Sequence, residues 1–154
     1  MPHMVLHIFV VVFSFFSIFV SPVFSAGTDD GSSTASTTAT SYADAKALAD
    51  AGNYAAALPA FEAITKEDPQ NADAWNMLGF THRMLGHTED SSQAYLVVLG
   101  INPNHLGALE YQGELFLQTG KIDAAKANLV KLQGLCGSCE EYEDLEKALK
   151  AAGA

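Results

Sequence analysis

The chain has 154 residues, with 8 basic and 18 acidic side chains, and its formal net charge at pH 7 is −10. This length allows one domain with a tail. The acidic charge argues against a nucleic-acid partner, because phosphate binding needs clustered lysine and arginine.

The first 25 residues have the layout of a secretory signal peptide. An apolar run over residues 8–20 is interrupted only by two serines, Pro22 ends it, and a cleavage site fits between Ser25 and Ala26. The run is short for a hydrocarbon core of about 30 Å. We therefore expect export, to a bacterial-type periplasm, with an uncleaved membrane anchor as the alternative because residues 1–25 contain no lysine or arginine.

Residues 26–40 are rich in serine and threonine and have no apolar side chain larger than alanine. Such a segment cannot bury enough surface to offset the entropy of ordering. We interpret it as a flexible linker.

The rest of the chain repeats every 34 residues. Each column of the repeat has a physical meaning: a glycine ends a helix where φ is positive, a small residue lets paired helices approach, a large one fills the space between them, and a proline ends the second helix. The columns are Gly52, Gly86 and Gly120; Ala45, Gly79 and Gly113; Phe61, Tyr95 and Leu129; Ala57, Ser91 and Ala125; Ile64, Val98 and Leu132; Pro69 and Pro103.

Apolar residues at helical spacing within each repeat predict an all-α protein. We expect helices over 41–51, 54–67, 72–85, 88–101, 105–119, 122–134 and 139–152. Asn71, Thr88 and Ser138 are the expected N-caps. No pattern typical of a β-strand occurs.

The last segment, residues 139–154, predicts a helix that covers the end of the stack. Tyr142, Leu145 and Leu149 share one face, acidic residues crowd the start of the helix, and lysines lie near its end, as the helix dipole favours. Ser138 and Glu141 have capping-box spacing.

The repeat resembles the tetratricopeptide repeat (TPR) family, whose motif runs W-x2-L-G-x2-Y, then A, F and P. The resemblance covers residues 38–139, as three units at about 38–71, 72–105 and 106–139. Departures are His82 where an aromatic is usual, Ser91 for alanine, no tryptophan in the outer units, and Gly137 in place of the last proline. The residues that match are Ala45, Leu48, Gly52, Tyr54, Ala57, Phe61 and Pro69; Trp75, Leu78, Gly79, Gly86, Tyr95 and Pro103; and Gly113, Phe116, Gly120, Ala125 and Leu129.

The resemblance implies a right-handed superhelical stack, an α-solenoid, whose concave face holds a peptide or helix of a partner protein. By family position, the groove residues would be exposed and would come from the first helix of each unit. They are Tyr42, Lys46, Ala49 and Asp50; Asp73, Asn76, Phe80, Arg83 and Met84; and Glu110, Glu114, Leu117 and Gln118.

Two sets of groove residues allow more than one interpretation. Exposed Phe80, Met84 and Arg83 would be partner anchors, or Phe80 would instead pack between units one and two. Glu110 and Glu114 would favour a basic or amine-bearing partner, or would only keep the surface soluble. They also make a clamp for a partner's terminal carboxylate the less favoured subtype, because such a clamp needs basic groups.

Cys136 and Cys139, in the sequence CGSC, are the only cysteines. Export favours a disulfide. A thiol–disulfide enzyme, a two-thiolate Cu(I) site and free thiols remain alternatives. Zinc would need further ligands.

His82, His87 and His105 are interpreted as structural or surface residues, because His82 and His87 do not share a helical face. We find no catalytic constellation and expect no cofactor or metal. The first hypothesis is therefore a non-enzymatic exported TPR scaffold, with self-association possible through its open ends and membrane contact only through an uncleaved N-terminus. The second is a thiol-redox or copper-handling protein that uses CGSC.

Overall fold

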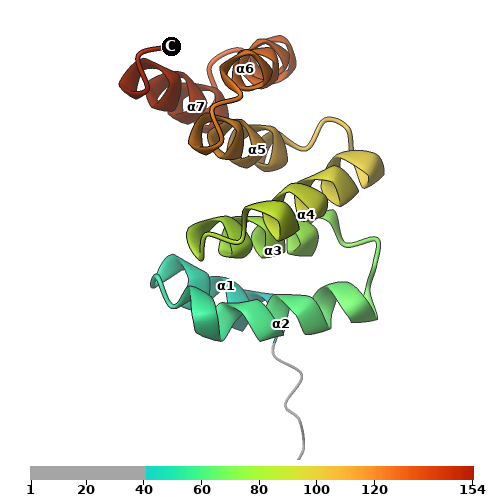
Figure 1. Cartoon of the computed structure of the whole chain (residues 1–154). Helices are drawn as coiled ribbons and strands as arrows, with labels where there is room; N and C mark the ends of the chain where they lie inside the picture. The colour runs from blue at the N-terminus through green and yellow to red at the C-terminus, as the bar shows by residue number, and fades with distance from the viewer. Residues whose placement is uncertain (1–40) are drawn as a thin grey trace, which may run out of the picture. The chain divides into compact units, whose positions relative to one another are not determined.

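The computed structural model describes residues 41–154, which form seven α-helices and no strand (Figure 1). The expected all-α class is confirmed, and the helices begin and end close to the expected positions. The predicted signal peptide and linker lie outside the described residues. The helices are α1 (Tyr42–Asp50), α2 (Tyr54–Glu67), α3 (Ala72–Met84), α4 (Thr88–Ile101), α5 (Leu106–Gln118), α6 (Ile122–Cys136) and α7 (Glu140–Ala151).

The helices pile up in sequence order as antiparallel pairs, α1 with α2, α3 with α4 and α5 with α6 (Figure 1). The first helices of the pairs are neighbours, since α3 contacts both α1 and α5. The last helix, α7, packs against α5 and α6, as expected for a helix that covers the end of the stack. Within residues 41–154, no helix combines the length and the apolar composition needed to cross a bilayer.

One turn geometry joins the two helices of every pair. Its glycine has a φ of +76° at Gly52, +81° at Gly86 and +73° at Gly120, the left-handed region that favours glycine. In the middle unit, the backbone N–H of His87 donates to the carbonyl of His82 (2.9 Å) and that of Gly86 to the carbonyl of Arg83 (3.0 Å). These two bonds define a Schellman motif, so the glycine column ends the helices as predicted.

The small-residue column brings helices into close contact. A Cβ added to Gly79 would lie 2.7 Å from Cε1 of Tyr95, which is fully buried. In the third unit, a Cβ on Gly113 would lie 2.6 Å from a methyl carbon of Leu145 in α7. The predicted partner there, Leu129, is only half-buried, because Leu145 of the last helix fills the space over Gly113.

Ser91, which departs from the family pattern, has a structural role. Its fully buried hydroxyl donates to the carbonyl of Gly79 at 2.8 Å. This bond joins α4 to α3 at the residue on which Tyr95 packs, and it satisfies a buried hydroxyl that would otherwise be costly.

Two of the three expected N-caps are wrong. Asn71 does cap α3, since its side chain accepts from the N–H of Ala74 at 3.0 Å. Thr88 is instead the first helical residue of α4, after His87, and Cys139 rather than Ser138 is the N-cap of α7, without a side-chain cap bond. The backbone N–H of His87 takes part in the turn that ends α3, so His87 rather than Thr88 precedes the first residue of α4. Ser138 lies one residue before the N-cap of α7, so it cannot form a capping box with Glu141.

Replacing Gly79 with alanine should lower the free energy of unfolding by about 1–3 kcal/mol, because the new methyl group overlaps a buried ring. Gly134→Ala in α6, where a Cβ meets nothing within 4 Å, is the matched control and should raise stability by up to about 1 kcal/mol. Urea denaturation measures both. Equal effects at the two positions would contradict the close contact of α3 and α4.

Candidate functional site

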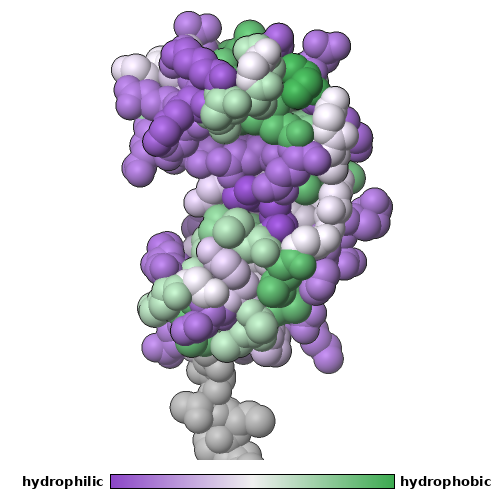
Figure 2. All heavy atoms as spheres, turned by 60° about the vertical axis from the view of Figure 1, so that its left-hand side comes forward, coloured by the Kyte–Doolittle hydropathy of each residue, from purple (hydrophilic) through white to green (hydrophobic). Residues whose placement is uncertain are grey.

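A hollow of about 320 Å³ lies among the first helices of the units and the start of α7. We call it the groove pocket. In Figure 2, hydrophilic residues gather around the hollowed part of this face. The lining residues are Tyr42, Lys46, Asn76, Met77, His105, Gly107, Glu110, Tyr111, Glu140, Glu141 and Asp144.

One column of the repeat supplies the centre of the groove pocket. Tyr42, Asn76, Glu110 and Asp144 follow one another at intervals of 34 residues, and all four line the pocket. The first three belong to α1, α3 and α5, and Asp144 belongs to α7. The last helix therefore contributes to the pocket as the first helix of a further unit would, although its amphipathic pattern predicts only a helix that covers the end of the stack.

The groove pocket is acidic. Four carboxylates line it, from Glu110, Glu140, Glu141 and Asp144, against one lysine. That lysine, Lys46, is already paired with Asp50 on the same helix at 2.8 Å. The surplus of negative charge favours a cationic group in the pocket.

Glu110 is the most perturbed carboxyl of this surface. Burial, followed by the negative charges of Glu114, Asp144 and Glu141, raises its pKa to about 8, and the guanidinium of Arg83 opposes this shift. The carboxyl is therefore largely protonated at neutral pH. A cation placed next to it would favour the charged form and lower the pKa.

The expected exposure of several groove residues is wrong. Asn76 is 6% exposed and Glu110 8%, Ala49 is also buried, and the side chain of Arg83 is 7% exposed. These positions face neighbouring helices, since α1, α3, α5 and α7 pack side by side. Asn76 and Glu110 still line the groove pocket, but as its floor rather than as free surface.

Arg83, the only arginine of the chain, joins units two and three instead of pointing to solvent. Its guanidinium pairs with Glu114 at 2.6 Å and lies 5.5 Å and 5.6 Å from the ring centres of Phe80 and Tyr111, in cation–π contact. Burial, with the charges of Glu110 and Glu114, raises the pKa of Tyr111 to about 12.

Phe80 packs between units, as the alternative interpretation held. Its ring contacts Tyr54 of α2, with ring centres 5.8 Å apart, and Tyr111 of α5, at 5.0 Å. Met84 is 43% exposed, as expected, and Leu117 is half-buried against the core of unit three. None of Phe80, Arg83, Met84 and Leu117 lines the groove pocket.

A second hollow, of about 380 Å³, adjoins the groove pocket and shares two residues with it. Glu110 and Asp144 line both, and Glu114 and Lys147 complete the polar part of the second hollow. The acidic surface therefore extends from α1 across α5 to the far part of α7.

Comparisons with known proteins agree with this geometry. Residues 42–105 match the sequence model of the family described as tetratricopeptide repeat. The match spans the first two of the three units, and the remaining helices continue the same stack. No curated protein matches the chain in sequence.

Several solved structures have the same fold. The Yersinia enterocolitica type III secretion translocator chaperone SycD, as an alternative dimer, has a TM-score of 0.64 at 20% identity, over 73% of this TPR chain and 88% of its own. PcrH, in complex with the chaperone binding region of PopD, has a TM-score of 0.62 at 25% identity, over 73% and 87%. The first TPR of Spaghetti (RPAP3), bound to the HSP90 peptide SRMEEVD, has a TM-score of 0.65 at 15% identity, over 76% and 92%.

The two cysteines of the TPR chain lie where α6 meets α7. Cys136 is the last residue of α6, Cys139 is the N-cap of α7, and their sulfurs are 2.04 Å apart. The pair is placed to tie the last unit to α7, and the disulfide stays a prediction. The comparisons give no support to the thiol-redox or copper alternative.

The expectation that His82 and His87 would not meet is wrong. The turn through Gly86 reverses the chain, so the two Nδ1 atoms lie 3.3 Å apart. Burial lowers the pKa of His82, Asp90 and Glu62 oppose this shift, and His87 adds to it. His105 has a structural role: its Nδ1 accepts from the N–H of Ala108, and its Nε2 lies 3.0 Å from Asp73.

Glu110 should make the stability of the TPR domain fall with rising pH. Its pKa is about 8 in the folded chain against 4.5 for an ordinary glutamate. The folded state therefore holds the proton more tightly, and the stability that this proton contributes is fully present below pH 4.5 and is lost as the pH rises to 8. The free energy of unfolding falls by at most about 1.4 kcal/mol per pH unit. The observed fall should be smaller, because solvent in the open pocket screens the charge.

Urea denaturation of Glu110→Gln at several pH values measures this contribution, because glutamine is uncharged throughout. The variant should lose less stability than the parent chain between weakly acidic and weakly alkaline pH. Exposed Glu67→Gln is the control and should leave the slope unchanged. Parallel slopes for Glu110→Gln and the parent chain would contradict the shift.

Replacing both cysteines with serine should lower the free energy of unfolding by about 2 kcal/mol, because the bond closes a very short loop in the unfolded chain. Dithiothreitol should lower the stability of the parent chain by a similar amount and leave the double variant unaffected. If reduction leaves the parent chain unchanged, the cysteines do not form a stabilising disulfide.

Proposed function

We propose that this protein is an exported, non-enzymatic TPR adaptor that binds a basic segment of a partner protein in the groove pocket. The observation that carries the proposal is the pocket itself, in which four carboxylates from α5 and α7 face a hollow large enough for a side chain and its neighbours. Export rests on the sequence of residues 1–25 alone.

The charge of the pocket determines the kind of partner. A lysine or arginine side chain that enters would lie near Glu110, Glu141 and Asp144 in a partly desolvated place. Interactions between charges are stronger there than on an open surface. Complementary charge also speeds encounter and rejects acidic partners.

A buried amide provides a second reason to expect a polypeptide. Among residues 41–154, no group is hydrogen-bonded to Oδ1 of Asn76, although this atom is buried and its residue lines the pocket. A buried acceptor without a partner is costly. A backbone or side-chain N–H of a bound segment would satisfy it.

Relatives with the same fold support the proposal. PcrH, at 25% identity, was solved in complex with the chaperone binding region of PopD. SycD was solved in complex with a peptide of the translocator YopD, and the RPAP3 domain with an HSP90 peptide. The dimer of SycD is in line with self-association, which for this chain stays a prediction.

Selection of peptides from a random display library on the immobilised chain tests the proposal. Enriched peptides should contain lysine or arginine, and their binding should weaken at high salt. Asp144→Lys should weaken binding at least about tenfold, equivalent to 1.4 kcal/mol, because it reverses a charge that lines both hollows.

Glu143→Lys is the matched control, because it makes the same change of charge on the same helix, at an exposed residue that lines neither hollow. It should change the affinity by less than about twofold, since its side chain lies outside both hollows. Equal loss in the two variants, or enrichment of peptides without basic residues, would contradict a specific acidic pocket.

A further inference from the structure

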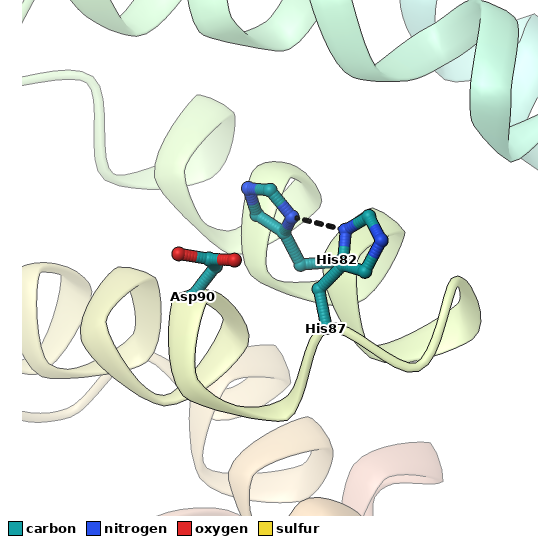
Figure 3. Close-up of side chains that lie close together, drawn as sticks. All are labelled: His82, His87 and Asp90. Atoms are coloured by element: carbon teal, nitrogen blue, oxygen red, sulfur yellow. Dashed lines mark hydrogen bonds between the residues drawn. The ribbon is translucent and has the colours of Figure 1, made fainter.

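Two histidines and an aspartate meet at the turn between α3 and α4. The Nδ1 atoms of His82 and His87 lie 3.3 Å apart, and the ring centres 5.5 Å apart. Asp90 lies beside them, so that one ligand atom from each residue falls within 4.8 Å of the other two. Figure 3 shows the two rings facing each other with the carboxylate next to them.

The backbone of the turn holds these side chains together. His82 and His87 are the two residues joined by the long bond of the Schellman motif, at 2.9 Å. Residues at these two positions are brought into side-chain contact by the motif. Asp90 follows in the first turn of α4, three residues after His87, on the same face of the helix.

The other two units form the same turn without such residues. The bond equivalent to that between His87 and His82 is 2.9 Å from Asn53 to Leu48 and 2.7 Å from Lys121 to Phe116. The fold therefore does not need two histidines here. The residues at the three positions are Leu48, Asn53 and Ala56 in the first unit, and Phe116, Lys121 and Ala124 in the third.

The distances fit a transition metal. Two nitrogens that each lie 2.0–2.1 Å from a tetrahedral zinc ion are about 3.3–3.4 Å apart, which is the separation of the two Nδ1 atoms. We infer that His82, His87 and Asp90 form a binding site for a divalent transition-metal ion of the zinc class, separate from the groove pocket.

The carboxylate can complete the set of three protein ligands. Asp90 is exposed, and among the described residues no hydrogen bond or ion pair fixes its side chain. A rotation of this side chain brings an oxygen to the ion. His87 and Asp90 are both exposed, so the fourth position is open to water, and the ion ties the end of α3 to the start of α4.

The test uses the full chain, stripped of metal with a chelator, and titrates it with zinc chloride in a calorimeter. The parent chain should bind one zinc ion per molecule. The triple variant His82→Leu, His87→Asn and Asp90→Ala carries the side chains of the first unit, so it should keep the turn. It should bind zinc at least about 100-fold more weakly, since loss of even a supporting residue costs 10–100-fold.

His105→Asn is the matched control, because it removes a histidine outside the cluster and keeps a good N-cap on α5. Its affinity for zinc should equal that of the parent chain. Zinc should raise the melting temperature of the parent chain and of His105→Asn but not of the triple variant. Cobalt should give the visible absorption of a tetrahedral site in the same two proteins only.

Three results would overturn the inference. The first is that the parent chain does not bind zinc. The second is that the triple variant binds zinc as tightly as the parent chain. The third is that His105→Asn loses zinc binding to the same extent as the triple variant. In the first case, the short distance between the two Nδ1 atoms is only a hydrogen bond between the rings. Circular dichroism of the triple variant shows whether it has kept its helices.

Discussion

In the second and third units, neighbouring helices touch at a residue that has no side chain. The ring of Tyr95 lies directly on Gly79, and the side chain of Leu145 lies on Gly113. These contacts set the distance between α3 and α4 and between α5 and α7. The hydrogen bond from Ser91 to the carbonyl of Gly79 satisfies a buried hydroxyl at the first of these contacts.

The spacing of the stack then determines the groove pocket. Residues at one position of the repeat face the same side in each unit, so Tyr42, Asn76, Glu110 and Asp144 meet although they are far apart in sequence. The sequence predicted the first three as groove residues. The sequence also contains the signal for Asp144, which follows Glu110 by the same 34 residues, but the amphipathic pattern of α7 by itself predicts only a cover for the core.

Periodicity predicted the helices well because apolar spacing and left-handed glycines are local properties. The state of single side chains is not local. Arg83 is buried because Glu114 and Tyr111 come from another unit to pair with it, and no spacing within α3 encodes that contact. Likewise, helical periodicity separates His82 from His87, whereas the reversal of the chain at Gly86 brings them together.

The three turns between paired helices have the same backbone conformation but differ in the side chains that they present. A stack of this kind thus has two periodic surfaces: the concave row of first helices, and an edge along which one turn recurs per unit. Side chains on that edge can change without altering the helical core, since the two hydrogen bonds that define the turn join main-chain atoms. An array built from more copies of the middle unit would carry paired imidazoles at regular intervals, an ordered row of identical sites on a scaffold of defined length.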